Sequence, residues 1–458
     1  MSEPYARAAA ELAEVDLAIT HATVVTMDDA ATVLRDTTII VNDGTIVGLL
    51  DSHLAPGPLA TGLPATGPRL RARRVLDAAG AIVMPGMVNA HAHLAMTMFR
   101  GLADDCDLDG FLATMLPVEG AVLSEQTVAV ASRLAVAESL RAGITTTLDM
   151  YFFPEETHTE ASAGGLRLHA GPVFLEFAGP DRRAFADRMA WARDWLAEAQ
   201  PGGAWLQPHS TYLLEEKQLR AIAELADETG ARINVHASET AAEVAQVLAR
   251  HGRRPIRVLD DCGLLGRRTV LAHGVHLDDE EIARIAASGA SVVHNPASNA
   301  KLASGTARIP DLLAAGVNVA LGTDGPASSN DLDLLFAMRL AAYVQKTVRR
   351  DATVVDAHTV LRMATVNGAR ALGLGEGHGR IAIGSPADLV VLSAEAASLA
   401  PAYDPHSAIV YAASRAEVDT VIVSGKVVVV GGRTTNIDAS DAARAVSALQ
   451  PTILAAMP

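Results

Sequence analysis

The sequence has few cysteines and no long apolar run. Its two cysteines, Cys106 and Cys262, lie far apart and form neither a Cys-x-x-Cys metal site nor a disulfide framework. No segment reaches the roughly 20 consecutive apolar residues of a membrane-spanning helix. The first 17 residues carry four acidic side chains and no apolar signal core. These absences predict a soluble protein of the reducing cytoplasm without a membrane partner.

Positive charge and aromatic residues are also scarce. The chain has 37 Lys and Arg against 53 Asp and Glu, a net charge of −16, which argues against a nucleic-acid partner because phosphate binding needs a basic surface. Aromatic residues make up 4% while hydrophobic residues make up 50%, so small aliphatic side chains must form the core. A length of 458 residues suits a barrel of about 250–300 residues plus a second unit.

Residues 81–384 alternate between strand-like and helix-like segments. Glycine follows the end of several helix-length segments, as Gly230 follows 215–229 and Gly289 follows 278–287. Another such segment is 125–141. Eight strand–helix repeats predict a (β/α)₈ TIM barrel, an α/β fold whose active site forms at the carboxyl ends of its strands. The expected strands are 82–88, 145–149, 166–174, 204–207, 232–236, 269–273, 291–294 and 318–322.

Both ends of the chain contain short strand-like runs instead. Asn42-Asp43-Gly44 between two of them is typical of a hairpin turn. A Pro/Gly/Ala-rich stretch at 56–68 predicts a surface loop, and 438–454 predicts a closing helix. Neither end is long enough to bury a large core alone, so residues 1–80 and 385–458 are expected to join as one small β-sandwich. The expected strands are 16–20, 22–27, 37–41, 45–50, 387–392, 418–423 and 426–430.

Four residues at predicted strand ends have the chemistry of metal ligands. His91 and His93 follow the run 82–88, and side chains two apart on a strand point the same way. His236 and Asp324 end two other strands at the same edge of the barrel. Three neutral imidazoles and one carboxylate suit a single divalent ion, Zn²⁺ first and Fe²⁺ as the alternative. A lysine-bridged pair of metals is not expected, because Lys217 in a predicted helix is the only lysine between His93 and His236.

Glu239, His273 and Asp324 are the predicted catalytic residues. Glu239 lies three residues beyond His236, far enough to act on the substrate as a general acid and base. His273 ends a strand and would orient the attacking water, while Asp324 would accept its proton. His276 lies further into the loop, and a purely structural role is as well supported for it as a role in the site. Any one of these residues alone could be a buried structural histidine or a turn acid, but their shared order favours a site.

These residues lie in motifs that resemble the amidohydrolase superfamily, in its deaminase and chlorohydrolase branch. The matching motifs are 85–93 (PGMVNAHAH), 236–239 (HASE), 272–276 (AHGVH), 294–299 (HNPASN) and 322–328 (GTDGPAS). Residues 96–105 (MTMFRGLADD) and 116–119 (LPVE) are similar to methylthioadenosine/S-adenosylhomocysteine deaminases. The resemblance implies a metal-dependent deaminase, commonly a homo-oligomer, that converts an adenine nucleoside to an inosine-type product and ammonia.

The resemblance also implies the substrate contacts. Glu119 corresponds to the family's glutamate for the ribose hydroxyls, and His209 to its histidine on the purine and ribose side. Ser328 lies near the site, and Phe111 replaces a frequent tryptophan as an aromatic wall. Arg182 is the candidate partner for a substrate carboxylate. Some members that accept S-adenosylhomocysteine have Arg before a Gly on strand three, where this chain has Ala170. A neutral 5′ group, as in methylthioadenosine, 5′-deoxyadenosine or adenosine, therefore fits at least as well.

Two alternatives differ in what the barrel does. A deaminase or hydrolase of a free heterocycle (guanine, pterin, cytosine or s-triazine) would keep the metal site but have no ribose for Glu119 to bind. A non-catalytic barrel would require the loss of at least one chemical group, and every expected group is present. A zinc deaminase of nucleic acids is disfavoured, because its His-x-Glu and Pro-Cys-x-x-Cys pattern is missing.

Overall fold

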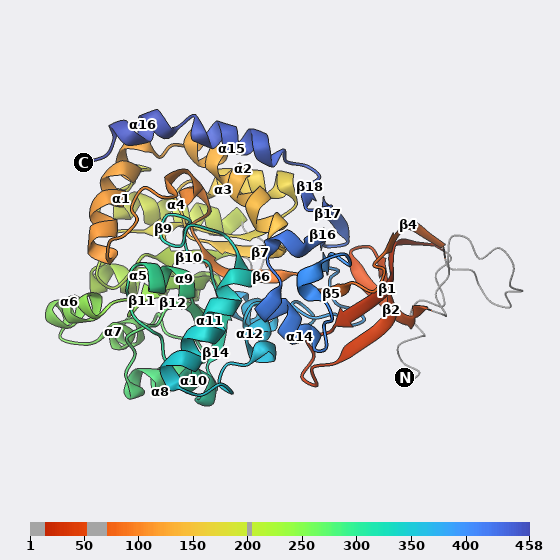
Figure 1. Cartoon of the computed structure of the whole chain (residues 1–458). Helices are drawn as coiled ribbons and strands as arrows, with labels where there is room; N and C mark the ends of the chain where they lie inside the picture. The colour runs from red at the N-terminus through yellow and green to blue at the C-terminus, as the bar shows by residue number, and fades with distance from the viewer. Residues whose placement is uncertain (1–13, 53–70, 199–203) are drawn as a thin grey trace, which may run out of the picture.

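The structure, a computed structural model, describes residues 14–52, 71–198 and 204–458 and contains a closed parallel barrel (Figure 1). Backbone pairing links β6-β7-β8 and β9-β10-β11-β12-β13-β14 into two arcs. A parallel bridge between Ala92 and Asp324 closes the ring between β14 and β6. The predicted TIM barrel is confirmed. Its strands are β6 (Met87–Ala92), β7 (Ile144–Asp149), β8 (Arg167–His169), β9 (Val173–Phe174), β10 (Trp205–Pro208), β11 (Arg232–Ala237), β12 (Thr269–His273), β13 (Ser291–His294) and β14 (Asn318–Leu321).

Two of the expected barrel strands are each divided in the structure. The run 82–88 contains β5 (Ile82–Pro85), which pairs with the terminal sheet, and only then β6 of the barrel. Gly86 separates them, and a Cβ there would lie 2.2 Å from Thr145 Oγ1. The run 166–174 is interrupted between β8 and β9. There a Cβ on Gly171 would lie 2.1 Å from the carbonyl oxygen of Trp205, so the chain bends at a point of close backbone approach.

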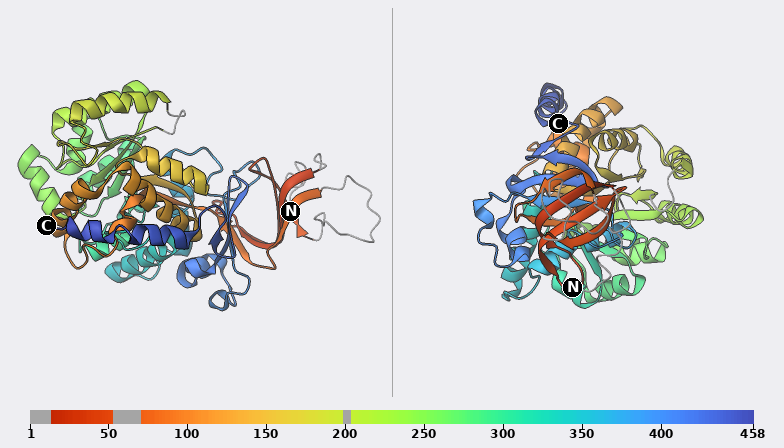
Figure 2. Two further views of the ribbon diagram at one scale, coloured as in Figure 1. Left: turned by 90° about the horizontal axis from the view of Figure 1, so that it is seen from above. Right: turned by 90° about the vertical axis from the view of Figure 1, so that its right-hand side faces the viewer.

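The two chain ends share one sheet of nine strands within the described residues, in the order β18-β17-β16-β15-β5-β1-β2-β3, with β4 paired to β1. Side chains from both ends meet in one apolar cluster that includes Ile39 and Leu389. The predicted joining of the ends beside the barrel is therefore confirmed (Figure 2). The remaining strands are β1 (Glu14–Val25), β2 (Val33–Asn42), β3 (Thr45–Asp51), β4 (Arg71–Asp77), β15 (Leu389–Leu392), β16 (Val418–Val423), β17 (Lys426–Val430) and β18 (Arg433–Thr434).

Local sequence signals account for much of this sheet. The runs 16–20 and 22–27 are a single strand, β1, with a positive φ of 53° at His21 between them. The hairpin signal is confirmed, because Asp43 and Gly44 have φ values of 47° and 71° between β2 and β3. The stretch 56–68 lies outside the described residues. Strand β5 belongs to this sheet although it lies beyond residue 80, and the domain limits at 80 and 384 stay predictions.

The barrel helices begin at strong capping residues. Ser124 caps α2 and Asp278 caps α8, each in a reciprocal capping box. Helix α2 has the predicted limits. Helix α5 begins one residue later than predicted, and α8 is shifted by one residue at both ends. The helices are α1 (Leu108–Val122), α2 (Glu125–Arg141), α3 (Pro154–Gly164), α4 (Phe185–Glu198), α5 (Glu216–Thr229), α6 (Ala241–His251), α7 (Pro255–Asp261), α8 (Asp279–Ser288), α9 (Pro296–Lys301), α10 (Ile309–Ala314), α11 (Leu334–Arg349), α12 (Ala357–Met363) and α13 (Val366–Leu372). Shorter helical segments are the 3₁₀ helices η4 (Leu94–Phe99), η5 (Ala397–Leu399) and η7 (Arg415–Glu417), the α-helical turn α14 (Pro405–Ser407) and the π-helix η6 (Ala408–Ala412).

The chain ends in two helices that return to the barrel. The predicted closing helix is divided into α15 (Ala439–Ser447) and α16 (Gln450–Ala455). Both lie across the barrel beside α1 and α2 in Figure 1. Val446 and Ile453 are buried in the same apolar cluster as Phe111 and Met115 of α1. Among the described residues, no helix is long and apolar enough to cross a membrane.

Candidate metal centre and active site

The four predicted metal ligands meet at the carboxyl end of the barrel. His91 lies on β6, His93 directly after it, His236 on β11 and Asp324 after β14. One ligand atom from each lies within 4.8 Å of the others. Asp324 Oδ1 is 3.1 Å from His93 Nε2 and 3.5 Å from His91 Nε2, and the Nε2 atoms of His93 and His236 are 3.3 Å apart.

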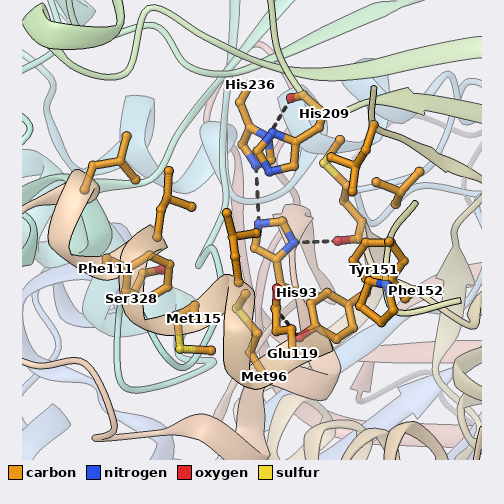
Figure 3. A pocket seen from close by; sticks show the side chains of 18 of the residues that line it. His93, Met96, Phe111, Met115, Glu119, Tyr151, Phe152, His209, His236 and Ser328 are labelled. Carbon is orange, nitrogen blue, oxygen red and sulfur yellow. Dashed lines mark hydrogen bonds between the residues drawn. The ribbon is translucent and has the colours of Figure 1, made fainter. Parts of the chain in front are cut away.

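Hydrogen bonds on the far side of two rings orient them toward this centre. Nδ1 of His93 donates to the carbonyl oxygen of Met150 at 2.6 Å, and Nδ1 of His236 donates to that of His209 at 2.8 Å (Figure 3). In neutral imidazoles these bonds leave both Nε2 atoms unprotonated. Two such acceptors cannot hydrogen-bond to each other, and the buried Nε2 of His91 has no hydrogen-bond partner in the described part of the chain. The donor set therefore fits a bound cation.

Asp324 is held in a strained position beside the histidines. Its φ of 62° is unusual for a residue with a side chain. Its backbone N–H donates to the carbonyl oxygen of His91 at 3.1 Å, and Ser328 Oγ donates to its Oδ2 at 2.8 Å. Burial would raise the pKa of Asp324, but the adjacent imidazoles of His91 and His93 bring the pKa well below its usual range. The carboxylate is therefore ionised, with Oδ1 facing the imidazoles.

Glu239 approaches the centre from a strained turn after β11. Ser238 has a φ of 54°, and the carboxylate of Glu243 on α6 accepts from the backbone N–H groups of Ser238 at 2.9 Å and Glu239 at 2.5 Å. The side chain of Glu239 comes within 3.6 Å of His273 Nε2. Burial raises the pKa of Glu239, against the charge of His273. A carboxyl group with a raised pKa holds its proton more tightly and is suited to pass it to a substrate.

His273 is fixed from behind by an amide. Its Nδ1 donates to Asn299 Oδ1 at 2.9 Å, which directs Nε2 toward Glu239 and the metal ligands. The residue has a φ of 74°, a second strained position at a barrel strand end. His276, in contrast, donates from Nε2 to the carbonyl oxygen of Ser304 at 2.6 Å and does not line the pocket. These contacts favour a structural role for His276.

A largely apolar pocket leads to this centre. Four residues predicted to contact the substrate line this pocket: Glu119, His209, Ser328 and Phe111. Their contact with a substrate stays a prediction. Arg182 does not: it is exposed, outside the lining, and its role stays a prediction. The other lining residues are Met96, Leu108, Leu112, Met115, Leu116, Gly120, Met150, Tyr151, Phe152, Val173, Leu175, Phe177, Ala178, Gly179, Pro180, Tyr212 and Leu302, with His93, His236, Glu239, His273 and Asp324 at the metal end.

Glu119, which is buried, and His209, which is half-buried, lie at opposite ends of this pocket in Figure 3. Glu119 on α1 accepts a hydrogen bond of 2.5 Å from Tyr151 Oη. Burial raises the pKa of Glu119 to about 7, although the hydrogen bond from Tyr151 opposes the rise. Burial lowers the pKa of His209 to about 3, so its ring is neutral. The ring centroid of His209 lies 4.6 Å from that of His236.

Three residues of the site had no assigned role in the sequence prediction. Tyr151 binds Glu119, Glu243 holds the backbone of Glu239, and Asn299 orients His273. Position gives a weak signal for each of them. Tyr151 follows a strand end, Glu243 lies one helical turn after Glu239, and Asn299 ends a motif that matched the family.

Comparison with known proteins agrees with this geometry. The chain is 42% identical over 378 residues to a 5-methylthioadenosine/S-adenosylhomocysteine deaminase of Syntrophobacter fumaroxidans, covering 80% of this chain and 85% of the relative. It is 39% identical to the protein of the same name from Nitratidesulfovibrio vulgaris, covering 92% and 94%. It is similar in structure to an adenosine deaminase from Xanthomonas campestris with bound zinc, with a TM-score of 0.90, 36% identity and coverage of 96% and 99%. The model of the amidohydrolase family matches residues 82–428, and the chain belongs to this family.

Proposed function

We propose that the protein is a metal-dependent deaminase of adenine nucleosides, which hydrolyses the C6–N bond and releases ammonia and an inosine-type product. One observation carries the proposal. Glu239 and His273 lie 3.6 Å apart beside the four-ligand centre, in an apolar pocket that also contains the buried carboxylate of Glu119. The relatives named 5-methylthioadenosine/S-adenosylhomocysteine deaminase and the zinc-bound adenosine deaminase support it.

The residues divide the proton transfers among them. His91, His93, His236 and Asp324 would hold the ion, for which we propose Zn²⁺, and the zinc-bound neighbour supports that choice. When bound, the ion supplies the Lewis acidity that makes water a nucleophile near neutral pH. Glu239 gives a proton to N1 of the purine ring as water attacks C6. Asp324 and His273 take one proton from the water and return it to the leaving amine. Glu239 recovers its proton from the hydroxyl group left on C6 as that oxygen becomes a carbonyl, so that water and the nucleoside yield the inosine-type product and ammonia.

The pocket supports a nucleoside with a neutral 5′ group over a free base or a charged substrate. Glu119 can bind the hydroxyl groups of a substrate only if the substrate carries a ribose. A free heterocycle has no ribose. The lining includes the apolar side chains of Met115, Leu116 and Phe152 and, among the described residues, no Lys or Arg. A carboxylate without a cationic partner would lose hydration there at a cost of several kcal/mol.

The test is a substrate panel on the protein with its metal content measured in parallel. Ammonia release is followed for adenosine, 5′-deoxyadenosine, methylthioadenosine, S-adenosylhomocysteine, adenine, guanine, cytosine, a pterin and an s-triazine. We expect the neutral nucleosides to react fastest, with one zinc per chain. Faster turnover of any free base would contradict the proposal, and iron in place of zinc would correct the metal. We also propose that the protein is cytoplasmic and forms a homo-oligomer. Light scattering on the purified protein tests the oligomeric state, and cell fractionation tests the location.

A further inference from the structure

Tyr151 and Glu119 form a buried pair between two elements that are distant in sequence. Tyr151 comes two residues after the end of β7 and Glu119 is on α1, and the exposed fractions are 4% and 5%. The phenol Oη donates to Glu119 Oε1 at 2.5 Å (Figure 3). Within the described residues this is the hydrogen bond that the carboxylate makes. Glu119 Oε2 is therefore left without a protein partner in a pocket of low polarity.

Glu119 Oε2 remains accessible from the pocket, so a ligand can reach this oxygen. A ligand that displaces water from a carboxylate oxygen must offer a donor in return. A hydroxyl group is such a donor, and a hydrogen bond to a charged acceptor is stronger than one between neutral groups. Because Tyr151 holds Oε1, Oε2 is the oxygen available to a sugar hydroxyl.

Tyr151 is itself fixed by the metal-binding strand ends. Asp149 Oδ1 accepts from the backbone N–H of Leu94, and the carbonyl oxygen of Met150 accepts from His93. The next residue is Tyr151, whose ring centroid lies 6.2 Å from that of His93. Three consecutive residues thus connect the metal ligand His93 to the sugar-binding carboxylate. The backbone of Tyr151 is therefore continuous with the segment that orients His93, and its phenol is held by the hydrogen bond to Glu119.

We propose that Tyr151 is the positioning residue that makes this protein selective for ribonucleosides over deoxyribonucleosides. It holds Glu119 in one orientation, so that Oε2 accepts from a ribose hydroxyl. The inference rests on the proposed function and extends it, because it assigns sugar selectivity to a residue that does not itself receive the hydroxyl. A role in packing alone, such as the edge contact between the rings of Tyr151 and Phe152, would not distinguish one sugar from another.

The test measures selectivity, not activity alone. Adenosine, 2′-deoxyadenosine and 3′-deoxyadenosine are compared by kcat/KM on zinc-loaded wild type, Tyr151→Phe, Glu119→Gln and the double variant. We expect Tyr151→Phe to lower the preference for adenosine over the better-discriminated deoxynucleoside about tenfold, the value of one charged hydrogen bond. The double variant should lose no more than Glu119→Gln alone, because the two side chains act as one unit. Zinc content should be unchanged in all variants.

A binding measurement separates the inference from the proposed function. Calorimetry gives dissociation constants for adenosine and 2′- or 3′-deoxyadenosine in a Glu239→Gln background, with and without Tyr151→Phe. Binding with the same sugar preference in both proteins, or an equal loss for all three nucleosides, would overturn the role of Tyr151 and leave the deaminase proposal intact. If no nucleoside binds, both are overturned. Tyr212→Phe, which removes a phenol from another part of the lining, is the matched control and should leave the preference unchanged.

Discussion

At the scale of single residues, the role of each side chain in this site depends on which of its atoms is hydrogen-bonded to a neighbour and which faces the centre. His93 and His236 use Nδ1 for backbone carbonyl oxygens and keep Nε2 for the centre. His273 uses Nδ1 for Asn299. Glu239 is held through its backbone N–H by Glu243, which leaves its carboxyl group beside His273. Outer hydrogen bonds of this kind fix tautomer and orientation, so their loss changes the chemistry without removing a ligand.

Replacement of Glu239 by Gln tests the proton-transfer role directly. The amide is close in shape but cannot donate and accept a proton at the ring nitrogen, so we expect kcat to fall by about 10²–10⁴-fold. Zinc content should be unchanged, because Glu239 is not one of the four ligands. Ammonia release and elemental analysis check both expectations. The exposed Glu376→Gln is the control and should behave as wild type. Wild-type turnover by Glu239→Gln would assign the proton transfer to another group.

At the scale of secondary structure, the closure between β6 and β14 depends on side chains more than on a backbone ladder. The backbone contributes one bridge there, between Ala92 and Asp324. Asn89 on β6 adds a two-way contact with Thr323: its Nδ2 donates to Thr323 Oγ1 at 2.7 Å, and its Oδ1 accepts from the Thr323 N–H at 3.0 Å. This contact lies one residue from Asp324 and two from His91. The contacts that close the barrel between β6 and β14 therefore also position two of the proposed metal ligands, His91 and Asp324.

Asn89→Ala should separate these two strands at the metal site. It leaves the buried N–H of Thr323 without a partner, while the Thr323 hydroxyl keeps its hydrogen bond to the carbonyl oxygen of Asp324. We expect a loss of about 1–3 kcal/mol in the free energy of unfolding. Zinc affinity should fall about 10–100-fold, as for other residues that support metal ligands. Denaturant titration and chelator competition measure the two effects. Asn318→Ala removes hydrogen bonds at the start of β14, away from Asp324, and should lower stability with zinc affinity retained. Equal zinc affinity in both variants would contradict the expectation.

Elements with local signals could be predicted from the sequence, whereas long-range pairs could not. Ser124 and the residues after it define α2, and Asp43-Gly44 defines a hairpin. The run 82–88 is uniformly apolar, so its periodicity cannot show that the chain leaves one sheet and enters another at Gly86. The metal ligands were predictable because each lies at the carboxyl end of a strand or shortly after it. The Asn89–Thr323 pair spans 234 residues and has no signal in a single sequence.

At the scale of the whole molecule, one ion would connect three separate barrel strands. His91 is on β6, His236 on β11, and Asp324 follows β14. An ion that binds only the folded state stabilises it by RT ln(1 + [ion]/Kd), about 4 kcal/mol at a free concentration a thousand times Kd. Chelation should therefore lower Tm and added zinc should restore it, as measured by calorimetry. His236→Ala should show a much smaller zinc-dependent shift, and an equal shift would place the ion elsewhere.

The last helix supports the pocket wall from outside, and a pair of neighbouring residues tests this. Ile453 is 4% exposed in the cluster that contains Phe111 and Met115, whereas Leu454 is 53% exposed. Ile453→Ala should lower the free energy of unfolding by about 2–4 kcal/mol. It should also raise KM, because α1 carries Glu119. Leu454→Ala should change stability by less than about 0.5 kcal/mol. Denaturant titration and steady-state kinetics compare them, and identical behaviour would contradict the contact.

The return of α15 and α16 to α1 has a consequence for synthesis on the ribosome. All four metal ligands have been translated by residue 324, well before the helices that cover α1 leave the exit tunnel. A nascent chain can therefore gather its ion-binding groups early, but it lacks the outer support of the wall that carries Glu119. We therefore expect competence for catalysis to arise late in translation, once α15 and α16 have packed beside α1 and α2.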